Sequence, residues 1–323
     1  MNVKIDRSEH MRRPVKTRGS NTEHHLAIRR VEFDWSNSPL EWIPKQRYAS
    51  FFINVIHLLL PLGEYWFCKI YKQALPYITD EKLREDVKGF IQQEAMHARA
   101  HDSAIDDYLA KNDINPRGYR KLMLWLFDVV LADKILGLIP TGRILYKPWL
   151  SFRLGVVAAI EHFTCVLGMY AIDNKLWDEA GADPVVLDIL RWHGAEEVEH
   201  RCVAYDVHQD MGGWYVTRFP IMLISIVAVL GLWAYGASYL MRQDDVLKKH
   251  KPSVLRPWLW REWSRVAKTG HLPSLSYLLR EATTYFRRSY HPIEEADTQV
   301  ALDYLASSPA AARAGSKYAT NVH

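Results

Sequence analysis

The 323-residue sequence contains little cysteine and no recognisable export signal. Its three cysteines, Cys68, Cys165 and Cys202, form no C-x-x-C pair and no even-numbered framework. This argues against a disulfide scaffold and sulfur ligation of a metal, and it predicts a reducing compartment. The first 30 residues are polar and basic and lack an apolar stretch, so we expect no secretory signal.

An excess of charge of one sign is also missing. The chain has 41 Lys and Arg against 37 Asp and Glu, a formal net charge of +4. No dense basic run is interleaved with aromatic residues, so no nucleic-acid partner is expected. Strand-like alternation is nearly absent, and 12% aromatic residues argue against disorder for most of the chain. The sequence therefore predicts an all-α protein.

The patterning divides the chain into five segments. They are a basic, loosely ordered arm (1–45), a ligand-bearing helical bundle (46–212), a hydrophobic, transmembrane-like helix (213–242), a basic and aromatic helical region (243–293) and a disordered tail (294–323). Within the bundle, Asp80-Glu81 and Asp183-Pro184 are predicted helix starts. Pro61 predicts a break or kink in the first apolar helix.

Two copies of one short pattern dominate the bundle segment: Glu94-x-x-His97 and Glu197-x-x-His200. Positions i and i+3 of an α-helix share a face, so each pair presents a carboxylate and an imidazole to one point. One such pair is a weak signal because Glu and His are common on helix surfaces. Two of them predict a metal centre.

Two lone glutamates strengthen this prediction, because Glu64 and Glu161 lie in strongly apolar stretches. A buried carboxylate needs a partner, which a dication, an arginine or a Trp or Tyr donor could supply. In ferritin-like four-helix bundles, two helices each give a Glu-x-x-His pair and two give a lone Glu. The ligand order here and the 67 residues between Glu94 and Glu161 fit that fold with one long crossover.

A further histidine extends the fourth ligand helix to His193-x-x-x-Glu197-x-x-His200. This pattern resembles the ferritin-like N-oxygenase family typified by p-aminobenzoate N-oxygenase, over roughly residues 60–205. The resemblance implies a third histidine at a di-iron site. It implies the ligand set Glu64, Glu94, His97, Glu161, His193, Glu197 and His200.

The phrases around the two Glu-x-x-His pairs, at residues 93–101 and 192–200, more closely resemble a large bacterial family named "predicted metal-dependent hydrolase". This second resemblance extends over most of the chain. Its ligand pattern nevertheless looks like that of an oxygenase.

Several neighbouring residues are weaker candidates. His101 shares a face with His97 and is either a further ligand or a donor to a ligand. His162 points about 100° away from Glu161 and is not expected to bind metal. Ligating histidines usually donate their second N–H to a carboxylate or carbonyl, and Glu199 or Asp206 could accept it.

The segment Phe219–Met241 has 23 residues without a charge. At about 1.5 Å per residue it is long enough for a hydrocarbon core of about 30 Å, although a fully buried central helix is an alternative. The basic stretch 242–268 favours a cytoplasmic C-terminal flank, and residues 257–263 suit a surface helix at headgroup level. We expect membrane association with the metal bundle on the cytoplasmic side, and the topology stays open.

Carboxylate and imidazole ligands suit two Fe ions, with Mn as an alternative. The sequence therefore favours an O2-dependent oxidoreductase that hydroxylates, desaturates or N-oxygenates an apolar, lipid-like or amine-bearing small molecule. Such an enzyme needs an external electron donor, since the chain shows no ferredoxin or flavin motif. A binuclear metal-dependent hydrolase is the main alternative, and metal storage or a membrane-anchored scaffold is the non-enzymatic one. A homodimer is the commonest oligomer to expect.

Overall fold

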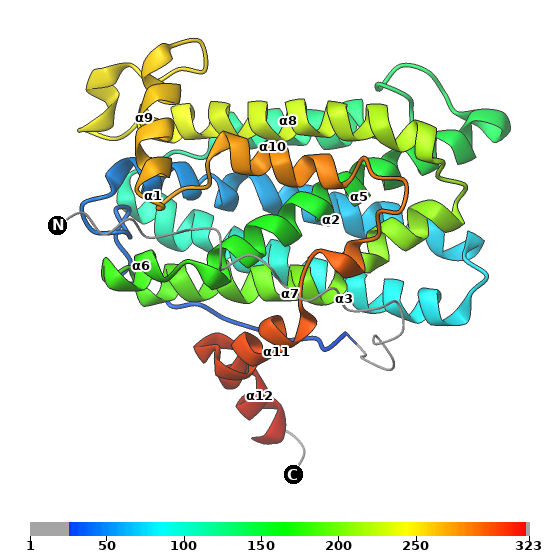
Figure 1. Ribbon diagram of the computed structural model, residues 1–323, viewed down its shortest axis with the longest axis horizontal. Coiled ribbons are helices and arrows are strands. Elements are labelled where there is room, and N and C mark those ends of the chain that lie inside the picture. The colour runs from blue at the N-terminus through cyan, green and yellow to red at the C-terminus, as the bar shows by residue number, and fades with distance from the viewer. Residues whose placement is uncertain (1–25, 321–323) are drawn as a thin grey trace.

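The computed structural model describes residues 26–320, and within that range the chain is helical and forms no β-strand. The prediction of an all-α protein is confirmed. Figure 1 shows the arrangement of the helices, with α8 along one edge and the long bundle helices beneath it. The helices are α1 (Arg47–Ile53), α2 (Ile56–Ala74), α3 (Glu81–Ala104), α4 (Arg117–Trp125), α5 (Gly142–Asp173), α6 (Lys175–Glu179), α7 (Pro184–Asp210), α8 (Tyr215–Met241), α9 (Pro257–Lys268), α10 (Leu275–Thr284), α11 (Thr298–Ser307) and α12 (Pro309–Thr320).

Four helices form the central bundle. Helix α2 packs mainly against α3, and α5 packs mainly against α7. Contacts of α3 with α7 and of α2 with α5 close the bundle. These are the four helices that carry the predicted ligands, so the bundle encloses them. The likeness to ferritin-like proteins remains a prediction from the ligand pattern.

The predicted starts of α3 and α7 are confirmed by their caps. The carboxylate of Asp80 accepts a hydrogen bond from the backbone N–H of Leu83 at 2.7 Å. Asp183 accepts from the N–H groups of Val185 and Val186, and Pro184 occupies the first turn, where no N–H is needed. The caps fix where each ligand helix begins and hence the rotation of its ligands.

The predicted break in the first apolar helix lies elsewhere. Residues 54–55 form a turn between α1 and α2, whereas Pro61 lies inside α2. Proline lacks the N–H that would bond to the carbonyl four residues earlier, but the helix tolerates this loss within its apolar surroundings. The turn at 54–55, rather than Pro61, separates α1 from the ligand-bearing α2.

Helices α5 and α7 approach each other through a pair of glycines. A Cβ placed on Gly168 would lie 2.5 Å from the carbonyl oxygen of Gly194, and one placed on Gly194 would lie 2.5 Å from Cα of Gly168. Real Cβ atoms do not occur at such distances, so both positions require glycine for this backbone approach. The contact sets the spacing between Glu161 on α5 and Glu197 on α7.

Three helical stretches of the described chain are long and apolar enough to cross a membrane. In Arg47–Tyr77 and in Gly142–Asp173, 78% of the most apolar 18-residue stretch is buried inside the protein. In Tyr215–Met241 (α8), only 28% of the corresponding stretch is buried. The alternative of a fully buried central helix is therefore wrong for α8. The first two stretches supply the core of the bundle.

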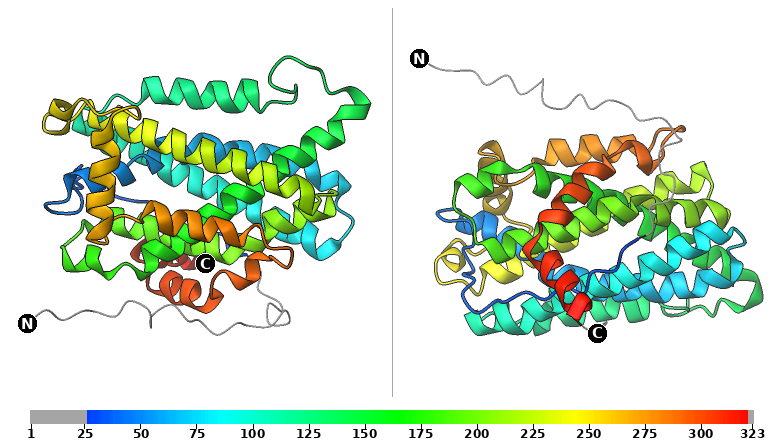
Figure 2. Two further views of the ribbon diagram at one scale, coloured as in Figure 1. Left: turned by 45° about the horizontal axis from the view of Figure 1, so that its top comes forward. Right: turned by 90° about the horizontal axis from the view of Figure 1, so that it is seen from below.

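Both ends of the described chain are more ordered than the sequence suggested. Residues 26–45 lack helix but bury Trp35 and Trp42 against the bundle, so the prediction of a loosely ordered arm is wrong there; residues 1–25 lie outside the described range. The predicted disordered tail instead forms α11 and α12, which cross α7 on the lower face of the bundle (Figure 2). Alanine favours helix, and Ala301 and Leu305 are buried by this packing.

Candidate metal centre

The seven predicted ligands lie in the interior of the bundle, and each is at most 3% exposed. Their ligand atoms form two adjacent groups, in each of which all atoms lie within 4.8 Å of one another. The first group contains Glu64, His97 and His193. The second contains Glu94, Glu161, Glu197 and His200. Helices α2, α3, α5 and α7 all contribute, as the sequence predicted.

In the first group, Nε2 of His193 lies 3.6 Å from Oε1 of Glu64, and it lies 2.7 Å from Oε1 of Glu197 in the second group. In the second group, Nε2 of His200 lies 3.2 Å from both Oε1 of Glu94 and Oε2 of Glu161. The nitrogen and oxygen atoms converge without any lysine or arginine between them. This arrangement offers two positions for cations.

Two carboxylates face both positions at once. Oε1 of Glu197 lies 3.4 Å from Nδ1 of His97, whereas its Oε2 lies 3.4 Å from Nε2 of His200. Glu94 is placed in the same way, with Oε2 at 3.9 Å from His97 and Oε1 at 3.2 Å from His200. Each can therefore bridge two metal ions, while Glu64 and Glu161 serve one position each.

The hydrogen-bonding state of these atoms supports a metal site. Both carboxylate oxygens of Glu64, Glu94 and Glu161, and Nδ1 of His97, are buried without a hydrogen-bond partner. Buried acceptors are almost always satisfied in proteins, and several unsatisfied carboxylate oxygens in one place need an explanation. A pair of dications would satisfy them, and the oxygen and nitrogen donor set fits iron or manganese.

The local electrostatics also favour cations. Burial raises the pKa of Glu94 above its ordinary value, although His97 partly opposes the shift. Burial acts against ionisation of Glu197 too, but His200, His193 and His97 together hold its pKa well below the ordinary range. Although burial opposes it, the neighbouring carboxylates raise the pKa values of His97 and His200 well above the ordinary value, whereas burial lowers the pKa of His193 to about 4. Without metal, His97 and His200 therefore provide the positive charge, and metal binding must displace their protons.

A layer of hydrogen bonds orients the histidines. Nε2 of His97 lies 2.9 Å from Oε2 of Glu196, which leaves Nδ1 turned towards the metal positions. Arg29, on the N-terminal segment, donates to Glu196 at 2.8 Å and to Glu199 at 2.9 Å. Trp192 also donates to Glu196. The carboxylate that supports His97 is thus itself fully paired, as is usual for outer-shell groups.

His200 is oriented through an amide. Its Nδ1 lies 3.1 Å from Oε1 of Gln93, whose Nε2 donates to Oε2 of Glu199 at 2.8 Å. Glu199 therefore supports a ligand as proposed from the sequence, but it does so through Gln93. The alternative acceptor Asp206 instead lies 3.0 Å from His291 and makes no such contact.

His101 lies outside both ligand groups and contacts a ligand instead. Its Nε2 is 2.6 Å from Nδ1 of His193, and its Nδ1 is 2.9 Å from Nδ1 of His57. Of the two roles open for His101, the structure places it as the partner that orients His193. His162 faces away towards Glu295 and Tyr290, as expected.

The sequence analysis missed Gln93, His57 and Arg29 as supporting residues. Gln93 could have been found, since it lies four residues before the Glu-x-x-His histidine and next to Glu94. His57 lies in an apolar stretch seven residues before Glu64 and could have been noted on the same ground. Arg29 gave no signal, because its contacts lie 167 and 170 residues away along the chain.

The family described as predicted metal-dependent hydrolase matches residues 27–296, which include all seven candidate ligands. The chain belongs to this family. No curated protein and no solved structure matches it. The match begins just before Arg29 and ends beyond α10, so residues 27–45 and helices α8 to α10 lie within the matched region, whereas α11 and α12 lie outside it.

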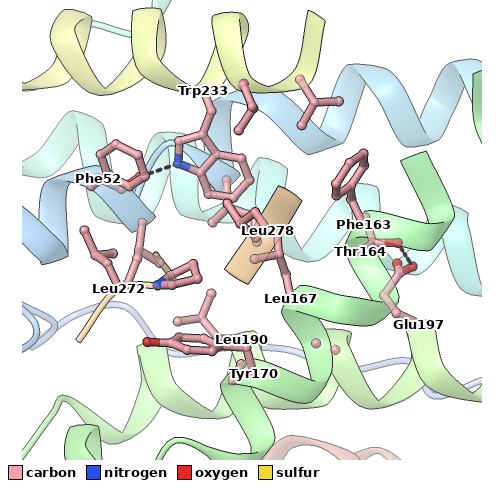
Figure 3. A pocket seen from close by; sticks show the side chains of 18 of the residues that line it. Phe52, Phe163, Thr164, Leu167, Tyr170, Leu190, Glu197, Trp233, Leu272 and Leu278 are labelled. Carbon is pink, nitrogen blue, oxygen red and sulfur yellow. Dashed lines mark hydrogen bonds between the residues drawn. The ribbon is translucent and has the colours of Figure 1, made fainter. Parts of the chain in front are cut away.

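An apolar pocket of about 130 Å³ reaches the centre in this member of the predicted metal-dependent hydrolase family. Figure 3 shows Thr164 and Glu197 at one end of it, with Trp233, Leu278 and Leu272 along its walls. His193 also lines it. Thr164 donates a hydrogen bond to Oε2 of Glu197, so this carboxylate is held where the pocket meets the two ligand groups.

Proposed function

We propose that this protein is a non-haem di-iron oxidoreductase that uses O2 to hydroxylate, desaturate or N-oxygenate an apolar or amine-bearing substrate. The observation that carries the proposal is the position of the pocket. It brings an almost entirely apolar space up to His193 and Glu197, beside two cation positions joined by two carboxylates. Two irons held this way supply O2 activation when bound.

The chain's own residues have separable tasks in this proposal. Glu94 and Glu197, which face both ligand groups, would hold the two metal ions next to each other. His101 and Glu196 fix the ring orientations of His193 and His97 by hydrogen bonds. The aromatic and aliphatic pocket walls exclude water and hold the substrate next to Glu197, which favours a reaction with O2 over hydrolysis. Electrons come from an external donor protein.

The runner-up is the metal-dependent hydrolysis that the family description names. Two metal ions can activate water and bind an ester or phosphate oxygen. However, none of the pocket-lining residues is a lysine or arginine that would bind a phosphoryl or carboxylate product. An uncharged ester remains compatible with the pocket. Metal preference and turnover distinguish the two functions.

The test starts from protein purified anaerobically in detergent and loaded with Fe(II). The proposal expects about two irons per chain, O2 consumption coupled to their oxidation, and Mössbauer parameters of a spin-coupled iron pair. The variant Glu64→Ala should lose one iron and the O2 reaction. The matched control Glu85→Ala, at an exposed position on α3, should retain both. Iron that is indifferent to O2, together with tight Zn or Mn binding and ester turnover, would establish the hydrolase instead.

We further propose that the protein associates with a membrane with the metal bundle on the cytoplasmic side, and that it forms a homodimer. The exposed apolar surface of α8 supports membrane association. The basic segment that follows α8 supports the cytoplasmic orientation. Flotation with vesicles and cross-linking in intact cells test these two proposals.

A further inference from the structure

The exposed face of α8 is a continuous apolar stripe. Val216, Phe219, Leu223 and Val227 are between 44% and 74% exposed, and their spacing of three or four residues places them on one side of the helix. The opposite side of α8 is buried against α5, α1 and α2. An apolar surface of this extent is unusual on a protein that meets only water.

The surface of α3, unlike that of α8, is charged. Helix α3 exposes Glu81, Lys82, Glu85 and Lys88. Figure 1 shows α3 and α8 running along opposite sides of the bundle, in roughly the same direction. If α8 crossed a bilayer, α3 would run through it alongside, and a helix that exposes charged residues is very costly there. The apolar stripe instead fits one leaflet, with α8 in the membrane plane and α3 in water.

Residues typical of an interface surround the stripe. Trp214 is 72% exposed at the start of α8, and Arg288 lies beside Tyr215 at the same end. Arg242 directly follows the last residue of α8. Aromatic and basic side chains at the borders of an apolar surface suit the headgroup layer.

The pocket that reaches the metal centre opens towards this same side. Helix α8 contributes Val229 and Trp233 to its walls, and α10 contributes Leu278 and Leu279. Leu279 lines the pocket and is 43% exposed, which places it where the pocket meets the surface. Helices α8 and α10 both line the pocket and make few contacts with each other. Along α5 the pocket runs from Phe163 to Ala171, which is about 12 Å at a rise of about 1.5 Å per residue.

We infer that this pocket binds one unbranched hydrocarbon chain of a membrane lipid, which enters between α8 and α10 from the leaflet that contacts α8. The inference rests on the proposed function for the consequence of binding, since the end of the chain would lie beside Glu197 and His193. Binding itself requires neither metal nor O2. The pocket is long, narrow and apolar, which suits an alkyl chain and excludes a polar headgroup.

The experiment uses the full chain in nanodiscs with a phosphatidylcholine that carries a diazirine at the end of one acyl chain. A parallel sample contains a free fatty acid with the same diazirine. After irradiation, mass spectrometry locates the labelled residues. We expect labels on pocket residues near Thr164 and Leu167, and the more efficient probe identifies the source of the chain. Labels confined to the outer face of α8, from both probes, would overturn the inference.

Substitutions on α10 provide a matched pair. Leu279→Trp narrows the mouth and should reduce pocket labelling at least tenfold. Leu275→Trp adds the same side chain one turn earlier, at a similarly exposed position that does not line the pocket, and should not change labelling. Leu278→Trp, deeper in the pocket, is the second blocking variant. Equal labelling in all three variants would contradict a chain in this pocket.

The two proposals can fail separately. Pocket labelling without Fe-dependent O2 consumption would support the binding site and reject the oxidoreductase. O2 consumption by the iron-loaded protein, with no label in the pocket, would support the oxidoreductase and reject the binding site.

Discussion

The most informative single substitution is Glu161→Gln, because it should stabilise the metal-free protein and destabilise the metal-loaded protein. Both oxygens of Glu161 are buried without a hydrogen-bond partner, and Glu94 and Glu197 contribute ligand atoms within 4.8 Å. Two carboxylates at that distance repel by about 3.5 kcal/mol at an effective dielectric constant of about 20. His200, whose Nε2 lies 3.2 Å from Oε2 of Glu161, opposes this effect, but burial and the two carboxylates still raise the pKa of Glu161 well above its ordinary value. Glu161 therefore favours its neutral form in the metal-free protein, and we expect the amide to stabilise that state by about 1–3 kcal/mol.

The metal-loaded state should respond in the opposite way. A ligand present at 100 times its Kd stabilises a protein by about 2.7 kcal/mol per site, and the amide weakens one site. Glu161→Gln should therefore raise the Tm of the metal-free protein and lower that of the loaded protein. Differential scanning calorimetry with chelator and with added Fe(II) under anaerobic conditions measures both.

A control defines what would refute this reasoning. Glu196 is also fully buried, but it is paired with Arg29, Trp192 and His97. Glu196→Gln should therefore destabilise the protein both with and without metal. If Glu161→Gln lowers the Tm of the metal-free protein as Glu196→Gln does, then the carboxylate of Glu161 is stabilised by neighbouring protein groups. In that case its unsatisfied oxygens are no evidence for a metal site.

Three further predictions concern the framework of the site and, in the last case, the ion pair between Arg47 on α1 and Asp244 after α8. Gly194→Ala should lower the free energy of unfolding by at least about 2 kcal/mol and weaken metal binding, because the added Cβ overlaps the backbone of α5. The control Gly231→Ala has open space around its Cβ and should leave the free energy of unfolding unchanged or raise it. Urea titrations measure both. His193→Ala should reduce the tightly bound metal from two ions to about one, measured by elemental analysis after desalting. Burial acts against ionisation of Asp244, but hydrogen bonds from Arg47 and backbone amides hold its pKa below the ordinary value. A carboxylate whose pKa is lower in the folded than in the unfolded protein stabilises the fold at neutral pH, and this stabilisation is lost as the pH falls through the folded-state pKa. Asp244→Asn should therefore be less stable than wild type at pH 7, and its stability should fall less than that of wild type between pH 5 and 3.

The ligand residues were predictable because helix geometry converts spacing directly into proximity. Glu94 and His97 share a face of α3, as do His193, Glu197 and His200 on α7, whatever the rest of the fold does. The two lone glutamates could be recognised because they interrupt apolar runs. The helix starts at Asp80 and Asp183 were predictable because their side chains cap locally.

Features that depend on distant contacts were not predictable. Arg29 meets Glu196 only because the N-terminal segment folds back along α7. The tail after residue 294 has few large apolar residues and was predicted to be disordered, yet α11 forms there and packs on α7. The pocket is lined by residues of α1, α2 and α5 to α10, so no single segment of the sequence could have indicated it.

The separation of the ligands along the chain has a consequence for biosynthesis. The first ligand, Glu64, leaves the ribosome long before the last, His200, and Arg29 precedes its partners on α7 by 167 and 170 residues. Neither metal position can be completed until α7 has been made, because α7 contributes to both ligand groups. During translation, the partly built site therefore exposes carboxylates and imidazoles to whichever divalent cation is abundant in the cell. Selection among cations by the complete ligand set would therefore begin only after α7 has been synthesised.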